Sequence, residues 1–218
     1  ALALWLGARA VGLIGGRAFS LDGKVVLITG AASGIGRRLA IKVSQAAEVT
    51  LALLDVDLDA LKRLQKELQQ DGGNSRVLVY DCDVSEHRRV GVVMGRSLEE
   101  LTPEQIQKTF AVNTMAHFWT AKVALPSMKR ASEALLVTVS SVMGMTSSAG
   151  LTDYCASKAA VNAFHEALRL ELWRDNIKSI RTLLVCPAAV DTGMFDVRLG
   201  GGLNGMDTWV DNSVVVKT

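Results

Sequence analysis

The residues whose types and spacing best suit chemistry are a tyrosine and a lysine one helical turn apart. Tyr154 and Lys158 stand at positions i and i+4 of a segment predicted to be a helix over 153–172, so their side chains share one face. A phenol has a pKa of about 10, and a neighbouring ammonium group stabilises the phenolate and lowers that value. The pair therefore predicts a proton donor and acceptor for a reaction at an alcohol or carbonyl. A surface pair without a chemical role is the alternative.

A serine at the end of a predicted strand favours the chemical interpretation. Ser141 follows the apolar segment 135–139, and ligands bind at the carboxyl ends of the strands in open parallel sheets. Its hydroxyl can hydrogen-bond a substrate oxygen while the phenol of Tyr154 exchanges the proton. Ser140 competes for this role, and a turn residue is the alternative for Ser141.

A glycine-rich turn, Thr-Gly-Ala-Ala-Ser-Gly-Ile-Gly over 29–36, separates a predicted strand from a predicted helix. Glycines at such a turn let the backbone approach a pyrophosphate, whose charge faces the N-terminus of the helix. An ordinary strand-to-helix loop is the alternative interpretation. The cofactor contacts predicted here are Gly30, Ser33, Gly34, Ile35 and Gly36.

Two carboxylates follow the next two predicted strands. Asp55 ends the second strand, where a carboxylate can accept hydrogen bonds from an adenosine ribose and repel a 2′-phosphate. It therefore favours NAD as the cofactor, although Arg37 and Arg38 leave NADP open. A helix N-cap is the alternative role for Asp55. Asp83, just past the third strand, is a candidate contact to the adenine.

Short apolar runs alternate with amphipathic runs along the chain. Strands that are apolar throughout are typical of a parallel sheet buried on both faces. The sequence therefore predicts an α/β fold with a doubly wound parallel sheet of the Rossmann type and helices on both faces. The predicted strands cover 25–29, 50–54, 76–80, 135–139 and 180–186, and the predicted helices cover 35–46, 58–70, 102–128 and 153–172.

The composition excludes several classes of function. The 218 residues are 49% hydrophobic, which excludes a solvated, disordered chain. The formal net charge of +2 and the scattered basic residues argue against a nucleic-acid surface. The three cysteines and three histidines are dispersed, so we expect reduced cysteines and no metal site.

These motifs, taken as a set, resemble those of the short-chain dehydrogenase/reductase family over roughly residues 21–195. The matching features are the glycine-rich turn, Asn113 in Val-Asn-Thr, Ser141, Tyr154, Lys158 and the segment 187–192. The resemblance implies a dehydrogenase that binds NAD(H) or NADP(H), in which Asn113 holds a proton relay through Lys158. It also implies that Pro187, Val190 and Thr192 line the nicotinamide end of the cofactor site, and that Asn113, Tyr154 and Lys158 contact the cofactor as well.

The segments 116–120, 153–158 and 186–195 resemble the branch of this family that contains retinol dehydrogenases and lipid-droplet 17β-hydroxysteroid dehydrogenases. That resemblance implies a lipophilic alcohol, aldehyde or ketone as substrate, such as a retinoid or a steroid, and a homodimer. It also implies that the apolar segment 1–20 attaches the protein to the endoplasmic reticulum membrane or a lipid droplet. By its residues alone this segment is short for a bilayer span and leaves a cytoplasmic protein open.

The sequence departs from the family pattern in two places. Between Asp83 and Asn113 the family has a helix, a fourth strand and an Asn-Asn-Ala-Gly motif, but this chain is too short there and lacks the motif. We therefore expect one central strand to be missing, with the break at residues 90–91. The tail 196–218 replaces the usual substrate lid, and its valine run predicts at most one edge strand. An altered transcript or gene prediction would explain both departures.

These observations predict an apolar N-terminal segment (1–20), a dinucleotide-binding catalytic domain (21–195) and an atypical tail (196–218). The predicted function is hydride transfer between a nicotinamide cofactor and a lipophilic alcohol or carbonyl compound, with Tyr154 as general acid and base. The first alternative is a shortened relative that dimerises or binds nucleotide without turnover. A Rossmann-type methyltransferase shares the glycine-rich turn but gives Tyr154 and Lys158 no role.

Overall fold

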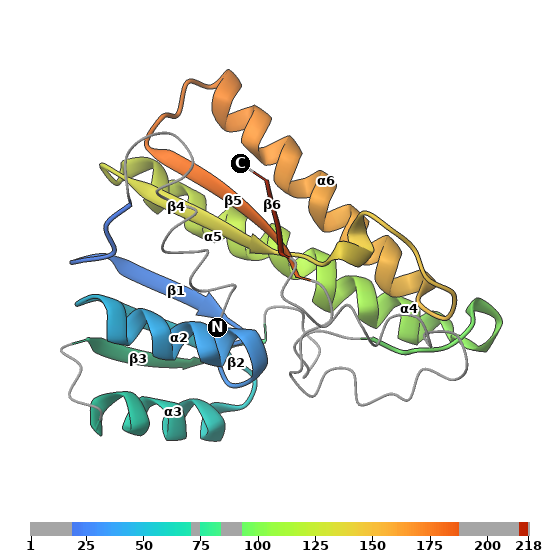
Figure 1. Ribbon diagram of the computed structural model, residues 1–218, viewed down its shortest axis with the longest axis horizontal. Coiled ribbons are helices and arrows are strands. Elements are labelled where there is room, and N and C mark those ends of the chain that lie inside the picture. The colour runs from blue at the N-terminus through green and yellow to red at the C-terminus, as the bar shows by residue number, and fades with distance from the viewer. Residues whose placement is uncertain (1–18, 71–74, 84–92, 188–213, 218) are drawn as a thin grey trace. The chain divides into compact units, whose positions relative to one another are not determined.

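The computed structural model describes residues 19–70, 75–83, 93–187 and 214–217 (Figure 1). The chain divides into two compact units, residues 1–90 and 91–218. This division falls at the same bond where the sequence predicts the loss of a strand. The predicted apolar segment 1–20 lies almost wholly outside the described residues.

The first unit is a three-stranded parallel sheet in the order β1-β2-β3. Each of the first two strands is followed by a helix that carries the chain back, because parallel neighbours need such a crossover. Both helices contribute to one apolar cluster with the sheet, so they cover the same face. The elements are β1 (Val25–Thr29), α2 (Gly34–Ala46), β2 (Thr50–Asp55), α3 (Leu58–Gln70) and β3 (Arg76–Asp81).

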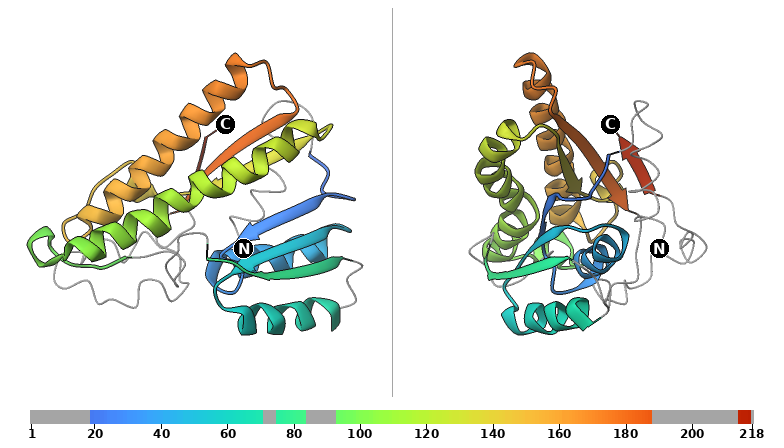
Figure 2. Two further views of the ribbon diagram at one scale, coloured as in Figure 1. Left: turned by 180° about the vertical axis from the view of Figure 1, so that it is seen from behind. Right: turned by 90° about the vertical axis from the view of Figure 1, so that its left-hand side faces the viewer.

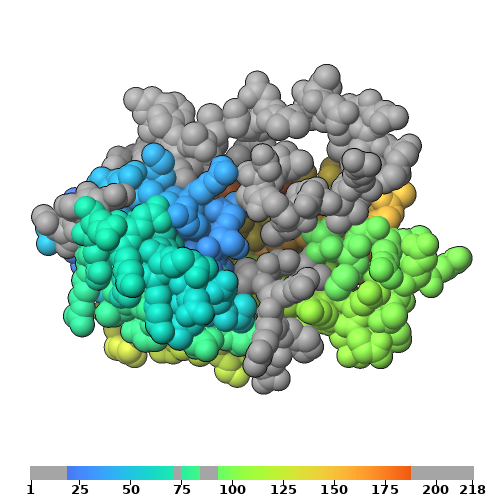
Figure 3. Space-filling model, turned by 90° about the horizontal axis from the view of Figure 1, so that it is seen from below, coloured from blue at the N-terminus to red at the C-terminus, as the bar shows by residue number. Residues whose placement is uncertain are grey.

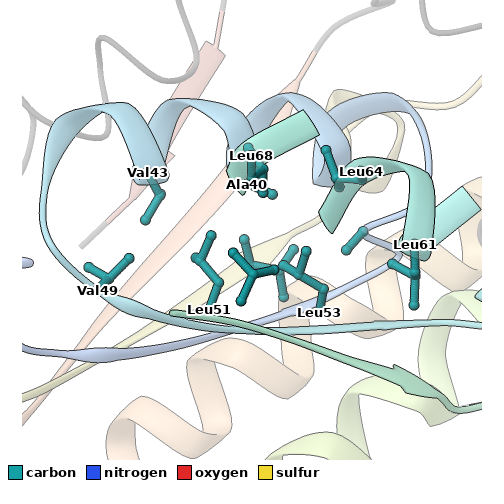
Figure 4. Close-up of a cluster of buried hydrophobic side chains, with 11 residues drawn as sticks. Ala40, Val43, Val49, Leu51, Leu53, Leu61, Leu64 and Leu68 are labelled. Carbon is teal, nitrogen blue, oxygen red and sulfur yellow. The ribbon is translucent and has the colours of Figure 1, made fainter. Parts of the chain in front are cut away.

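The core of the first unit lies between β2 and its two helices (Figure 4). Leu61 and Leu64 of α3 stand one turn apart and point at Leu51 and Leu53 of β2. All four side chains are inaccessible or nearly so. Burying a leucine fully contributes about 1.5–3 kcal/mol, so this cluster holds the unit together. The solvated outer side of α3 is at the surface in Figure 3 (teal).

The second unit is also a three-stranded sheet, in the order β4-β5-β6. Strands β4 and β5 are parallel, and β6 adds an antiparallel edge strand to β5. The valine run of the tail thus forms the edge strand that the sequence predicts. The elements are α4 (Pro103–Phe110), α5 (Ala116–Arg130), β4 (Ala134–Val139), α6 (Thr152–Arg174), β5 (Ile180–Pro187) and β6 (Val214–Lys217), with 3-10 turns at η1 (Leu98–Glu100) and η3 (Val142–Gly144).

The helices α5 and α6 lie side by side in both views of Figure 2 and pack on β4 and β5. Ala121 of α5, Leu168 and Leu172 of α6 and Ile180 of β5 form their shared apolar cluster. Burial of this cluster holds the two helices against the sheet.

The single helix predicted over 102–128 is wrong in one respect. A π-helical segment, η2 (Ala111–Met115), separates α4 from α5. Such a segment widens the helix locally, and hydrophobic periodicity does not reveal it. The start of α4 agrees with its signals: Thr102 and Gln105 form a reciprocal capping box, and Pro103 occupies the first turn.

The remaining predicted strands and helices agree with the structure to within about two residues at each end. The structure thus has the predicted α/β order of parallel strands and connecting helices. Across the described ranges, no strand stands between β3 and β4 along the chain, and β1 and β4 each pair with a single neighbour. The predicted absence of one strand agrees with this. Among the same residues, no helix is both long and apolar enough to cross a bilayer.

Candidate functional site

The glycine-rich turn of the first unit brings the backbone of α2 against the end of β1. Gly30 has a φ of 66°, a conformation that side chains disfavour. A Cβ on Gly36 would lie 2.1 Å from the carbonyl oxygen of Gly30, so only glycine lets the helix approach the turn. The helix begins at Gly34, and Ser33 caps it without a side-chain hydrogen bond. The amide groups of this helix end can therefore receive an anion.

Asp55 lies against this turn. Its Oδ2 accepts a hydrogen bond from the Ala32 amide at 2.9 Å, and its Oδ1 accepts one from the Asp57 amide at 3.1 Å. The carboxylate is only 4% exposed. It therefore fixes the shape of the turn, a role that the sequence does not predict, while it stays beside the place predicted for a ribose. The alternative role, N-cap of α3, belongs to Asp57, which accepts a hydrogen bond from the Ala60 amide.

The other predicted groups of this unit lie near the same edge of the sheet. Arg37 forms an ion pair with Glu67 of α3, whereas Arg38 is exposed on α2. Asp83 is half-buried two residues beyond β3. The Cys82 amide beside it donates to the carbonyl oxygen of Asp55, which ties the ends of β2 and β3 together.

In the second unit, Ser141 and Tyr154 meet between the end of β4 and the start of α6. Their side chains are hydrogen-bonded, and both are buried. Burial raises the pKa of Tyr154 above its usual value, and the hydrogen bond with Ser141 opposes that rise. Ser140 is also buried, but its Oγ donates to the backbone carbonyl of Lys158 at 3.2 Å. The geometry thus distinguishes the two serines, because only Ser141 is directed at the phenol.

Lys158 lies on the same face of α6 as Tyr154, with its Nζ 5.8 Å from the centre of the phenol ring. Burial lowers the pKa of Lys158 to about 8. The sequence-based expectation that the ammonium lowers the pKa of the phenol is wrong for this structure. Burial dominates the phenol, and the lysine is itself largely neutral at the pH where a phenol ionises.

Asn113 lies in the π-helical segment and is bonded to α6 through a serine. Its Nδ2 donates to Ser157 Oγ at 3.2 Å, and that hydroxyl donates to the Tyr154 carbonyl at 2.7 Å. Thr114 Oγ1 donates to the Ser157 carbonyl at 3.0 Å. Ser157 thus joins the π segment to the turn of α6 that carries the tyrosine and lysine. Sequence reasoning missed Ser157, although its position between Tyr154 and Lys158 was a signal.

Two further titratable side chains lie near Lys158. Burial, together with the charges of Lys158 and His165, lowers the pKa of His117 to about 4, so His117 is neutral at physiological pH. Cys186 is buried at the end of β5, and its Sγ donates to Asn162 Oδ1 at 3.8 Å. Burial raises the pKa of the Cys186 thiol, and the nearby Lys158 opposes that rise.

Pro187, predicted at the nicotinamide end, is the buried last residue of β5, whose neighbour β4 leads into Ser140 and Ser141. Val190 and Thr192 lie outside the described residues. Among the residues that the structure describes, no group of three histidine, cysteine, aspartate or glutamate side chains could hold a metal ion. The predicted catalytic residues Asn113, Ser141, Tyr154 and Lys158 therefore lie together in the second unit, and the glycine-rich turn and Asp55 lie together in the first.

The chain matches the family model described as short chain dehydrogenase over residues 24–97 and again over residues 88–199. It is 35% identical to Retinol dehydrogenase 10-B of Danio rerio, and the match covers 81% of this chain and 64% of that protein. It is 36% identical to Short-chain dehydrogenase/reductase family 16C member 6 of Bos taurus, over 81% of this chain and 62% of that protein. The chain thus spans less than two thirds of the length of these relatives.

Both sequence comparisons bear on the missing strand. The family model matches in two pieces that meet at residues 88–97, beside the division between the units. The alignment with the Danio rerio protein is 216 positions long but includes only 81% of the 218 residues of this chain. Some of its positions are therefore gaps in this chain. The relative therefore has internal segments that this chain lacks.

A solved structure of the same family has a similar fold. A short chain dehydrogenase/reductase from Burkholderia phymatum in complex with NAD has a TM-score of 0.72 and 32% sequence identity to this chain. The similarity covers 81% of this chain and 69% of that one.

Proposed function

Because the chain belongs to the short-chain dehydrogenase/reductase family, we propose that it transfers a hydride between a nicotinamide cofactor and the alcohol or carbonyl group of a lipophilic substrate. The observation that carries the proposal is the buried contact of Ser141 with Tyr154 beside Lys158. The pKa of Lys158, on the same helix face as Tyr154, is lowered to about 8, and a shifted pKa of this kind is typical of catalytic sites.

The protein groups supply proton transfer and orientation. In the oxidation direction, the Tyr154 phenolate takes the hydroxyl proton of the substrate, and Ser141 Oγ hydrogen-bonds the same oxygen. Near neutral pH Lys158, with a pKa of about 8, is largely charged, and this charge makes ionisation of the phenol more favourable than it would be without the lysine. In the reduction direction, Tyr154 returns the proton to the carbonyl oxygen. The nicotinamide accepts or donates the hydride at the substrate carbon.

The first unit fits a dinucleotide. Gly36 lets α2 lie directly against the backbone of Gly30, and the N-terminus of α2 can face a pyrophosphate. The buried Asp55 beside the turn favours NAD, since it would repel a 2′-phosphate. Arg37 is paired with Glu67, so Arg38 remains as the arginine that could bind a 2′-phosphate and so favour NADP. The Burkholderia phymatum relative binds NAD, and we expect Pro187, Val190 and Thr192 to contact the nicotinamide.

Two observations support a lipophilic alcohol, such as a retinoid or a steroid. The relatives include proteins named retinol dehydrogenase. Apolar side chains from Val93, Met143, Leu151 and Cys155 pack in one cluster with Tyr154. An apolar wall beside the proton donor would stabilise a hydrocarbon chain or ring and exclude water from the reaction.

We also propose that two copies of the chain pair through α5 and α6. Large apolar side chains are exposed along these helices, among them Val123 at 81% and Trp173 at 78%. Phe118 and Trp119 extend the stripe on α5. A stripe of this size on a soluble domain is typical of an interface. The apolar segment 1–20 would attach such a dimer to the endoplasmic reticulum membrane or to a lipid droplet.

A second candidate function is that of a non-catalytic relative that binds nucleotide or a partner without turnover. The observation that favours it is the absence of a strand between β3 and β4 among the described residues, together with gaps in the match to the Danio rerio relative. Both candidates share the proposed domain arrangement, a dinucleotide-binding domain over 21–195 and an atypical tail over 196–218.

Fluorescence titration of NADH against the purified chain separates the two candidates. An enzyme binds NADH and oxidises retinol or a steroid alcohol with NAD or NADP, and the Tyr154→Phe variant binds NADH equally well but does not turn over. Binding without turnover of any alcohol supports the non-catalytic candidate. Turnover that survives in Tyr154→Phe contradicts the proposed role of the phenol.

A further inference from the structure

The turn that follows Ser141 rests directly on the backbone of the catalytic helix. Ser141 starts η3 by accepting the Met143 amide on its Oγ at 3.2 Å, and the Gly144 amide donates to the Ser141 carbonyl at 3.0 Å. A Cβ on Gly144 would lie 2.7 Å from both the carbonyl carbon and the carbonyl oxygen of Lys158. The contact is therefore one of backbone against backbone, and it has no space for a methyl group.

Two polar contacts surround the same junction. Ser140 Oγ donates to the Lys158 carbonyl at 3.2 Å, which ties the strand end to α6 on one side of the turn. On the other side, Asn162 Nδ2 lies 2.7 Å from the position of that Gly144 Cβ. Asn162 is held in turn by the hydrogen bond that its Oδ1 accepts from Cys186. The turn is thus fixed between α6 and the end of β5.

We propose that Gly144 is a positioning residue that sets the distance between the Ser141 hydroxyl and the Tyr154 phenol by letting η3 contact α6 at Lys158. A methyl group at position 144 must displace either the turn that carries Ser141 or the helix that carries Tyr154. A flexible side chain could rotate away, but the contact atoms of Lys158 are backbone. Either displacement disturbs the hydrogen bond between the serine and the tyrosine.

The effect on turnover rests on the proposed function, whereas the effect on the phenol concerns only the folded chain. The chain has two tyrosines, so a Tyr80→Phe background leaves Tyr154 as the one phenol in an absorbance titration. Because the hydrogen bond with Ser141 lowers the pKa of Tyr154, Ser141→Ala should move its titration midpoint upward. Gly144→Ala should move the midpoint in the same direction.

A double-variant cycle tests the coupling. If Gly144 acts through Ser141, the variant with both substitutions shows no larger shift than Ser141→Ala alone. Ser147→Ala is the control, because Ser147 is exposed in the loop between η3 and α6. We expect no shift in that control. A parental midpoint in folded Gly144→Ala, or full additivity in the cycle, overturns the proposal.

Turnover and a milder variant complete the test. In an active chain, Gly144→Ala lowers kcat about tenfold to a hundredfold while the Kd for NADH stays unchanged, as expected for a misplaced catalytic group. If circular dichroism shows that Gly144→Ala does not fold, Ser140→Ala replaces it, and its unchanged midpoint overturns the proposal. The expected phenol shifts in a chain without turnover support the positioning role and count against the proposed function instead.

Discussion

The two units use different interactions in their interiors. Leucine and valine side chains from β2, α2 and α3 form one apolar cluster in the first unit. The second unit buries hydroxyl, amide, imidazole and carboxyl groups: of the eleven buried polar side chains among the described residues, all but Ser44 and Asp55 belong to it. Apolar burial is non-directional, whereas each buried polar group needs a partner in a fixed direction. The first unit thus forms a stable platform, and the second holds reactive groups in fixed orientations.

The largest effect that we expect is a loss of turnover from a substitution in the second unit. Tyr154→Phe removes the proposed proton donor and acceptor, so we expect kcat to fall about a thousandfold, within the range for general acid–base catalysis. The Kd for NADH should not change, since the predicted pyrophosphate site lies in the first unit. Steady-state kinetics with a retinol or steroid substrate measures the loss. Tyr80→Phe, which alters an exposed side chain of β3, is the control and should keep full activity.

The next effect is on the stability of the first unit. Leu64→Ala empties part of the apolar cluster and should lower the free energy of unfolding by about 2–5 kcal/mol. Hydrogen exchange read by mass spectrometry should show faster exchange in β2 and α3. Leu170→Ala, at an exposed position of α6, is the control and should change the stability by less than about 0.5 kcal/mol. Equal losses from the two variants would contradict the assignment of the core.

A pH effect follows from a half-buried histidine of the second unit, His117. The pKa of His117 is lowered in the folded state from 6.5 to about 4, so between these values the unfolded chain binds more protons. Stability should therefore rise as the pH increases from about 4 to 6.5, with a contribution from this group of about 1–3 kcal/mol. Urea unfolding of His117→Gln across this range measures it. A slope as steep as in the parent chain would show that His117 has no such shift.

The smallest effect concerns the serine that joins the π segment to α6. Ser157→Ala leaves the Asn113 amide without its hydroxyl acceptor and should lower the free energy of unfolding by about 1–2 kcal/mol. Ser44→Ala, at a buried position of α2 in the first unit, is the matched control, and we expect the smaller change there. Thermal unfolding of both variants makes the comparison. A larger loss of stability in Ser44→Ala than in Ser157→Ala would contradict the difference between the two interiors.

The sequence by itself determined the order of the elements and the placing of Tyr154 and Lys158 on one helical face. Both follow from local rules: hydrophobic periodicity selects strand or helix, and a spacing of four residues places two side chains on the same side of a helix. The resemblance to the family pattern, rather than these local rules, identified the short region between Asp83 and Asn113. The structure agrees, because no strand stands between β3 and β4 in the ranges that it describes.

Only the tertiary structure decided what those residues meet. It directs Ser141 at the phenol and Ser140 at the Lys158 carbonyl, a distinction that two adjacent serines do not reveal. It also reverses the expected pKa direction of Tyr154, since burial by residues far apart in sequence outweighs one neighbouring charge. Desolvation of a side chain depends on all the residues packed around it, and the contact of Gly144 with Lys158 depends on how two distant segments pack. A local sequence pattern therefore predicts neither.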